Sequence, residues 1–214
     1  MRKQAVLTET ALVDKRSIDR ETVLLLIDVQ EGFKDQKWGR RNNPRAEAKI
    51  AQLLNTWRVS RRPIIHVQHV SQEHASIFAP ESPGIALQDF ARPANGELLL
   101  QKRVNSAFIG TKLDRSLKER GATALVVVGF TTDHCVSSTV RMAGNLGYRT
   151  IVVADGTATF ERRSIDNKPV GPEIIHQIHL LSLQGEFAEV LDADMVLSLS
   201  EKESDRIALK PGSC

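Results

Sequence analysis

Three side chains in this sequence could together cleave a carbonyl compound. Asp28 follows the apolar run TVLLLI, Lys102 ends the run ELLLQK, and Cys135 comes shortly after ALVVVGF. A carboxylate beside a thiol can take its proton and later return it to a leaving amine, and an ammonium group can hold both in place. We therefore interpret Asp28 as general base and acid, Lys102 as the positioning cation and Cys135 as the nucleophile.

The position of Cys135 at the start of an expected helix favours an activated thiol. Exposed N–H groups at a helix N-terminus carry partial positive charge, and a nearby lysine favours the thiolate further. Each residue taken alone also has a structural interpretation, as a turn former, a solvent-facing lysine or a packed cysteine. Their joint placement at one edge of a sheet favours catalysis.

The elements that must position these residues alternate along the chain. Apolar runs predict strands at 22–28, 63–69, 97–102, 124–129 and 150–154, with a sixth at 187–191, and helical spacing predicts helices at 46–58, 111–120, 135–146 and 172–184. This alternation is typical of a three-layer αβα Rossmann-like fold with a mainly parallel sheet of about six strands. The carboxyl ends of such strands meet at one edge, where ligands bind. The proline-containing stretch 70–95 is expected to be a long loop.

Length and composition restrict the class of protein. The chain has 214 residues, of which 41 % are hydrophobic, and we expect one domain over 1–214 with its core at about 20–195. The first residues offer neither a signal sequence nor a membrane span, which predicts a cytoplasmic protein. Two cysteines make a poor disulfide framework. Basic residues such as Arg162–Arg163 are scattered without stacking aromatics, so we interpret them as solvated surface and expect no nucleic-acid partner.

Four segments carry a resemblance to a known family. They are LLLIDVQEGF at 24–33, QKRVNSAFIGTKL at 101–113, VVVGFTTDHCVSSTVRMAGNLGY at 126–148 and VVADGTATF at 152–160. In this order they resemble the isochorismatase-like cysteine hydrolases, a superfamily that includes nicotinamidase and N-carbamoylsarcosine amidase. The resemblance implies the triad Asp28, Lys102 and Cys135. It also implies assembly into a homo-oligomer through helical faces.

The same resemblance implies details of the pocket. A cis peptide is implied at Phe130–Thr131, and the backbone N–H groups of Thr131 and Cys135 would then form an oxyanion hole. Phe33 and Phe108 match apolar positions that line the pocket in relatives, with ordinary core packing as the alternative.

The histidines of the chain argue against a metal site. Nicotinamidases carry an Asp-x-His metal motif, whereas this chain has HVQHVSQEH at 66–74, and strand alternation places His66 and His69 on opposite faces of the sheet. We therefore expect no metal. No cofactor is expected either, because DVQEGF after the first strand is not a dinucleotide-binding motif. His69 and His134 are candidate substrate contacts, or else structural and capping histidines.

The leading hypothesis is a cysteine hydrolase that cleaves an amide, ureido or carbamoyl C–N bond of a small-molecule substrate through a thioester. Three alternatives stay open at this point: vinyl-ether hydrolysis of the isochorismatase type, a metal-assisted nicotinamidase-like activity, and a non-catalytic module that binds a small molecule or a partner.

Overall fold

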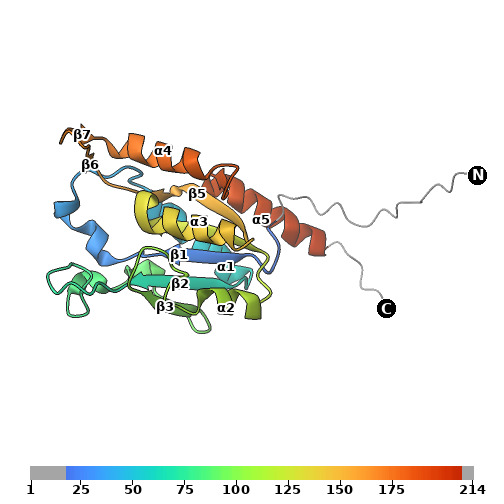
Figure 1. Ribbon diagram of the computed structural model, residues 1–214. Helices are drawn as coiled ribbons and strands as arrows, with labels where there is room; N and C mark the ends of the chain where they lie inside the picture. The colour runs from blue at the N-terminus through green and yellow to red at the C-terminus, as the bar shows by residue number, and fades with distance from the viewer. Residues whose placement is uncertain (1–17, 209–214) are drawn as a thin grey trace, which may run out of the picture.

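The computed structural model describes residues 18–208, which form a parallel sheet between helices (Figure 1). Six strands pair in the order β3-β2-β1-β4-β5-β8, all in parallel. They are β1 (Val23–Ile27), β2 (Ile64–His69), β3 (Leu98–Lys102), β4 (Ala124–Phe130), β5 (Arg149–Ala158) and β8 (Glu189–Leu191). The predicted three-layer α/β class is therefore confirmed, and each predicted strand is present.

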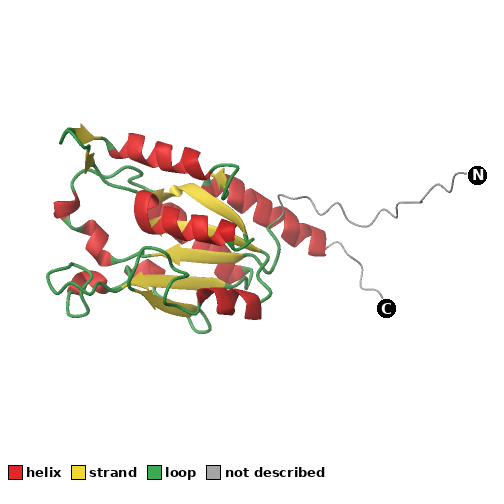
Figure 2. Cartoon of the chain, viewed as in Figure 1, coloured by secondary structure: helices red, strands yellow, loops and turns green. Residues whose placement is uncertain are grey.

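The two faces of the sheet are covered by different helices (Figure 2). Alternate residues of β1 enter different cores, since Leu24 packs with α1 (Ala46–Val59) and α5 (Ala193–Ala208) whereas Leu25 packs with helices on the other face. Those helices are α2 (Leu113–Glu119), α3 (Ser137–Asn145) and α4 (Pro172–Leu183). Both faces of the sheet are buried beneath helices, which explains the continuous apolar runs in the sequence.

Two elements were not predicted from the sequence. Between β5 and α4 lies a short antiparallel hairpin of β6 (Arg162–Arg163) and β7 (Pro169–Val170). The helix α5 follows β8, and its apolar residues Ala193 and Val196 join the core beside α1. Strands of two residues carry almost no periodic signal, so the hairpin could not be recognised from alternation.

The long segment after β2 is a loop, as predicted, with two 3-10 turns, η3 (Pro83–Ile85) and η4 (Asp89–Ala91). The buried Gln30 side chain ties it to the sheet, because its amide nitrogen donates to the backbone oxygens of His69 (3.0 Å) and Ile85 (2.8 Å). Two further 3-10 turns after β1, η1 (Glu31–Lys34) and η2 (Gln36–Trp38), lie at the same end of the sheet.

The expectations for the chain ends lie outside the described residues. They concern the amino-terminal segment and Cys214, the second of the two cysteines. Within residues 18–208, no helix is long and apolar enough to span a membrane.

Candidate active site

Three buried side chains from three strands meet at the carboxyl edge of the sheet. The Lys102 Nζ atom lies 2.7 Å from Asp28 Oδ2 and 3.1 Å from Cys135 Sγ. The Asp28 and Lys102 side chains are fully buried, and Cys135 is 8 % exposed. The structure therefore brings together the three residues that the sequence singled out.

The local backbone conformation positions Asp28 and Cys135. Asp28 has a positive φ of 51°, a conformation that aspartate tolerates better than most residues. On the neighbouring strand, Gly129 has a φ of 118°, and a Cβ atom there would lie 1.9 Å from the backbone oxygen of Ile27. Only glycine allows β4 to run this close to β1 immediately before the turn that carries Cys135.

The turn after β4 holds the nucleophile. The Phe130–Thr131 peptide bond is cis, which is the conformation that the resemblance implied. Residues Thr132–Val136 then form a π-helical turn that leads into α3, so the helical region begins three residues before the predicted start at Cys135. The Val136 N–H donates to the Thr131 oxygen at 3.1 Å, which places Cys135 inside this first turn.

Burial and the neighbouring carboxylate favour the protonated form of the Cys135 thiol. Burial raises the pKa of Cys135, and the negative charge of Asp28 raises this pKa further, while Lys102 opposes the shift. Desolvation disfavours the charged form, so burial here opposes the thiolate that Lys102 favours. Activation must therefore come from a proton acceptor during the reaction.

Lys102 keeps its positive charge in this setting. Burial on its own lowers the pKa of Lys102, but the charge of Asp28 and the hydrogen bond to Cys135 raise it more, and the net pKa is raised. His69 is its third neighbour, with Nδ1 at 3.3 Å from Nζ. Burial and the charge of Lys102 lower the pKa of His69, so the neutral ring can accept a hydrogen bond from the ammonium group.

The three neighbours of Lys102 carry ligand atoms that could bind a metal ion. One ligand atom each of Asp28, His69 and Cys135 lies within 4.8 Å of the others. The Lys102 ammonium lies within 3.3 Å of all three side chains and supplies positive charge among them. A metal ion bound by this set would have to displace the ammonium group.

A cavity of about 160 Å³ opens onto the thiol. Its lining is Asp28, Phe33, Trp38, His69, Phe78, Asn105, Thr131, His134, Cys135 and Arg162. Phe33, His69 and His134 therefore lie where the sequence analysis expected them. Phe108 is not among the residues that line this cavity, and its ring stacks on Tyr148 with centroids 6.1 Å apart.

Four lining residues were missed by the sequence analysis. Trp38 and Phe78 pack against Phe33 and form an aromatic wall, with centroid separations of 5.5 and 4.8 Å. Asn105 Oδ1 lies 3.7 Å from Cys135 Sγ. Arg162, interpreted as solvated surface, instead reaches the cavity from the β6–β7 hairpin. Asn105 lies in the quoted segment 101–113, and Phe78 lies in the predicted loop 70–95. These two segments were the signals in the sequence that could have pointed to them.

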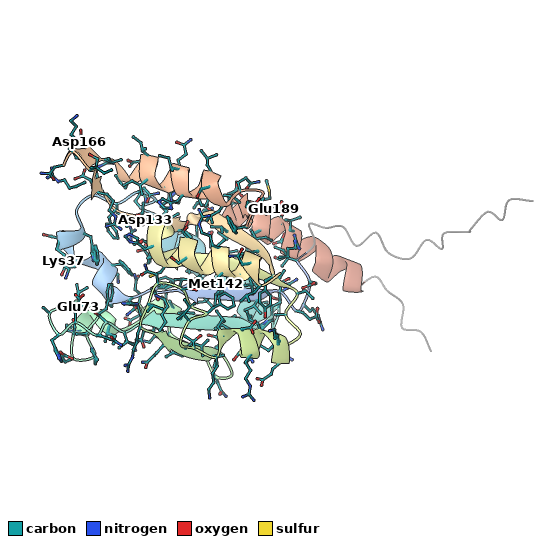
Figure 3. All side chains as sticks on the ribbon, viewed as in Figure 1. Lys37, Glu73, Asp133, Met142, Asp166 and Glu189 are labelled. Atoms are coloured by element: carbon teal, nitrogen blue, oxygen red, sulfur yellow. The ribbon has the colours of Figure 1, made fainter. Side chains whose placement is uncertain are left out.

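Polar contacts hold the π-helical turn Thr132–Val136 in place. Asp133 accepts hydrogen bonds from Thr159 and from Arg162 Nε, the latter at 3.0 Å, and Figure 3 labels Asp133 near the amino end of α3. Burial on its own raises the pKa of Asp133, but these two donors lower it to about 2. Next to it, Thr132 Oγ1 lies 2.9 Å from His176 Nδ1 on α4. These contacts connect the turn to Thr159 just after β5, to the hairpin and to α4.

The fold and this site define a three-layer α/β protein with a buried cysteine in its pocket. Residues 22–195 match the model of the isochorismatase domain. The chain belongs to the isochorismatase family.

Known proteins that resemble the chain agree with this family. The uncharacterized isochorismatase family protein YrdC of Bacillus subtilis is 40 % identical over 181 residues, which cover 85 % of this chain and 97 % of that protein. A crystal structure assigned to the isochorismatase family, from Chromobacterium violaceum, is 39 % identical with a TM-score of 0.82 and covers 85 % of this chain and 94 % of that one. Ureidoacrylate amidohydrolase RutB of Methylobacterium radiotolerans is 33 % identical over 121 residues, 56 % of this chain and 43 % of that protein.

Proposed function

We propose that the protein hydrolyses a C–N bond of a small amide, ureido or carbamoyl compound, with Cys135 as the nucleophile. The observation that carries the proposal is the Lys102 ammonium, which lies 2.7 Å from Asp28 Oδ2 and 3.1 Å from Cys135 Sγ, and both of these partners line an open cavity. Nucleophile, base and orienting group are recognised by such a constellation.

Attack on the carbonyl begins from the thiol. As the bond forms between Cys135 Sγ and the carbonyl carbon, the thiol proton moves to the Asp28 carboxylate. The Lys102 ammonium holds the two groups in register and stabilises the negative charge as it passes from Asp28 to sulfur. The carbonyl oxygen becomes an oxyanion that the N–H groups of Thr131 and Cys135 would stabilise.

Collapse of this intermediate breaks the C–N bond. Asp28 returns its proton to the leaving nitrogen, which departs as ammonia or a small amine, and the acyl group stays on Cys135 as a thioester. Asp28 then takes a proton from water as the water attacks the thioester carbonyl. Collapse of this second intermediate breaks the C–S bond, Asp28 returns the proton to the Cys135 sulfur, and the acid product leaves.

The cavity supports a small substrate with a flat apolar part. Its volume is about 160 Å³, and Phe33, Trp38 and Phe78 form one wall. Polar groups of Asn105 and Arg162 line the same cavity and can fix the orientation of a polar substrate end. The name of the relative ureidoacrylate amidohydrolase describes a C–N hydrolysis and supports this bond type.

A substrate screen tests the proposal. Primary amides, ureas and carbamoyl compounds are incubated with the protein, and released ammonia is measured. We expect release by the wild type, release by an exposed-loop control Glu73→Gln, and a loss of more than about 1000-fold in Cys135→Ala. Ammonia release that persists in Cys135→Ala would remove the covalent mechanism.

The rival activities make different predictions. Vinyl-ether hydrolysis predicts that Asp28 is essential and Cys135 dispensable, and a metal-assisted reaction predicts a loss of rate with chelator. The Cys135 sulfur at the base of the cavity favours acyl transfer over both. A non-catalytic module predicts that no compound in the screen is consumed.

We also propose that the chain forms a homo-oligomer through α4, while a cytoplasmic location stays a prediction. Ile174, Ile178 and Leu181 are 55, 58 and 66 % exposed at helical spacing on this helix. Such an apolar stripe on a water-facing helix is typical of a protein interface. Light scattering on the wild type and on Ile178→Glu tests assembly, with a smaller species expected for the variant.

A further inference from the structure

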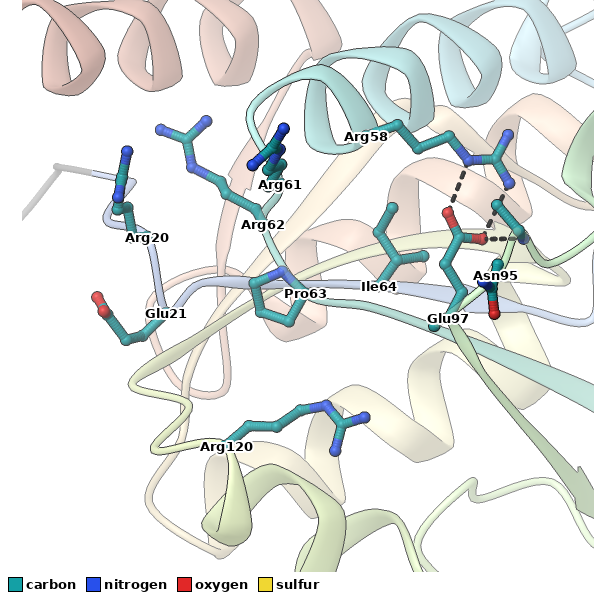
Figure 4. A pocket seen from close by; sticks show the side chains of 12 residues that line it. Arg20, Glu21, Arg58, Arg61, Arg62, Pro63, Ile64, Asn95, Glu97 and Arg120 are labelled. Carbon is teal, nitrogen blue, oxygen red and sulfur yellow. Dashed lines mark hydrogen bonds and ion pairs between the residues drawn. The ribbon is translucent and has the colours of Figure 1, made fainter.

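A second and larger hollow lies at the opposite end of the sheet. It has a volume of about 670 Å³ and is formed where β1, β2 and β3 begin. Its lining is Arg20, Glu21, Arg58, Arg61, Arg62, Pro63, Ile64, Ala94, Asn95, Gly96, Glu97 and Arg120, and we call it the arginine groove (Figure 4). Strands of five or six residues separate it from Cys135 by about 17–20 Å, so it is not part of the hydrolase cavity.

Two of the five arginines in the groove are already held by the protein. Arg58 binds Glu97 through two contacts, Nε–Oε1 at 2.7 Å and Nη2–Oε2 at 2.9 Å. Arg62 is buried and donates to backbone oxygens, among them those of Asp19 at 3.1 Å and Ser200 at 3.0 Å. These contacts fix one wall of the groove and leave Glu97 neutralised by its neighbour.

The other three arginines have unused donors. Within the part of the chain that the structure describes, the side chains of Arg20, Arg61 and Arg120 make no hydrogen bond or ion pair, and all three are exposed. Arg120 comes from the end of α2 and lies across the groove from Arg61 (Figure 4). The remaining carboxylate is Glu21, so the groove has a clear excess of positive charge.

The geometry points to a binding site for a small phosphate-bearing anion in the arginine groove. All five cations are arginines, and the planar guanidinium group binds phosphate oxygens in a bidentate manner that lysine cannot reproduce. Guanidinium groups gathered from separate elements repel one another, and an anion with two or more negative oxygens relieves this repulsion. The hollow is large enough for a ligand of nucleotide size.

Titration calorimetry on the full chain tests this site. Sodium pyrophosphate and ADP are the probes, and sodium chloride at equal ionic strength is the blank. The groove variant is Arg61→Gln combined with Arg120→Gln. The matched control is Arg45→Gln combined with Arg103→Gln, which removes two exposed arginines outside the groove. Thermal melts establish that both variants fold.

We expect saturable binding of both probes by the wild type and by the control variant. The groove variant should bind at least about tenfold more weakly, because each charged hydrogen bond contributes on that scale. Absence of saturable binding, or an equal loss in both variants, would overturn the site. Binding of single-stranded RNA without binding of either probe would also overturn it, in favour of a nucleic-acid surface. Because the readout is binding, the result is independent of the proposed hydrolysis.

Discussion

Two charged trios lie at opposite ends of the parallel sheet. At the carboxyl end, Lys102 joins Asp28 and Cys135. At the amino end, Glu97 joins His66 Nε2 at 2.7 Å and Arg58 Nε at 2.7 Å. Both trios combine a carboxylate with a cation and a third titratable group, and both lie against the sheet.

The two trios differ in how much hydrogen-bond acceptor capacity their carboxylates have left. Glu97 is fully engaged, since it also accepts the Ala94 N–H at 2.8 Å. Among the described residues, neither oxygen of Asp28 meets hydrogen-bond geometry, although Oδ2 is ion-paired with Lys102. A saturated carboxylate stabilises the fold, whereas one with free acceptor capacity beside a thiol can move a proton. Buried charge alone therefore does not identify an active site.

Removing the carboxylate from the trio Asp28, Lys102 and Cys135 should have the largest effect on turnover. Asp28→Asn is expected to lower turnover more than about 1000-fold, because the thiol then has no proton acceptor. Since the charge of Asp28 raises the pKa of Cys135, the same variant should react faster with iodoacetamide at neutral pH. Alkylation followed by mass spectrometry measures this. Slower alkylation in the variant would contradict the assigned charge balance.

Removing the cation from the site trio should cost stability as well as activity. Lys102→Met leaves Asp28 charged and buried without a partner, which typically destabilises a protein by about 3–5 kcal/mol. Urea unfolding measures the loss. The control variant is Lys112→Met, because Lys112 is exposed and forms no ion pair with a buried carboxylate among the described residues. Equal unfolding free energies for the two variants would refute the coupling of Lys102 to Asp28.

The two histidines of β2 separate structural from functional contacts. His66→Leu should destabilise the fold by about 1–3 kcal/mol through its lost bond to Glu97, with kcat changed less than about twofold. His69→Leu should lower kcat/KM by about tenfold with little loss of stability, because His69 contacts Lys102 and the cavity. The reverse order of effects would show that the trios have been assigned the wrong roles.

The smallest effects concern the dependence of stability on pH. Burial on its own raises the pKa of Glu97, but Arg58, the Ala94 N–H and His66 lower it to about 2. A lowered folded-state pKa gives stability that is complete above the unfolded pKa near 4.5 and is lost as the pH falls toward 2. Glu97→Gln should flatten this acid limb in thermal melts. An unchanged acid limb would argue against the amino-end trio as its source.

The alkaline limb tests the other trio. Because burial raises the pKa of Cys135 above its usual 9.0, the unfolded chain releases the thiol proton first, and stability falls as the pH rises above about 9. Cys135→Ser should reduce this loss, while Glu97→Gln should leave it unchanged.

The sequence predicted the parts of the molecule that repeat along the chain. Runs such as VLLLI are buried on both faces, so the strands and the edge that gathers Asp28, Lys102 and Cys135 followed from pattern alone. The raised pKa of Cys135 did not, because burial depends on residues distant in sequence. Arg162 was misplaced for a related reason: it lies in the short β6–β7 hairpin, and strands of two residues have no detectable period.

Trapping the acyl intermediate tests the central claim most directly. A compound found to release ammonia is mixed with the wild type, quenched in acid within one turnover, and analysed by intact and peptide mass spectrometry. The predicted result is a mass increase equal to the acyl part of the compound, confined to the peptide that contains Cys135 and absent in Cys135→Ala. Turnover with an unmodified Cys135, or with the acyl group on another residue, would contradict the claim that this thiol attacks the carbonyl.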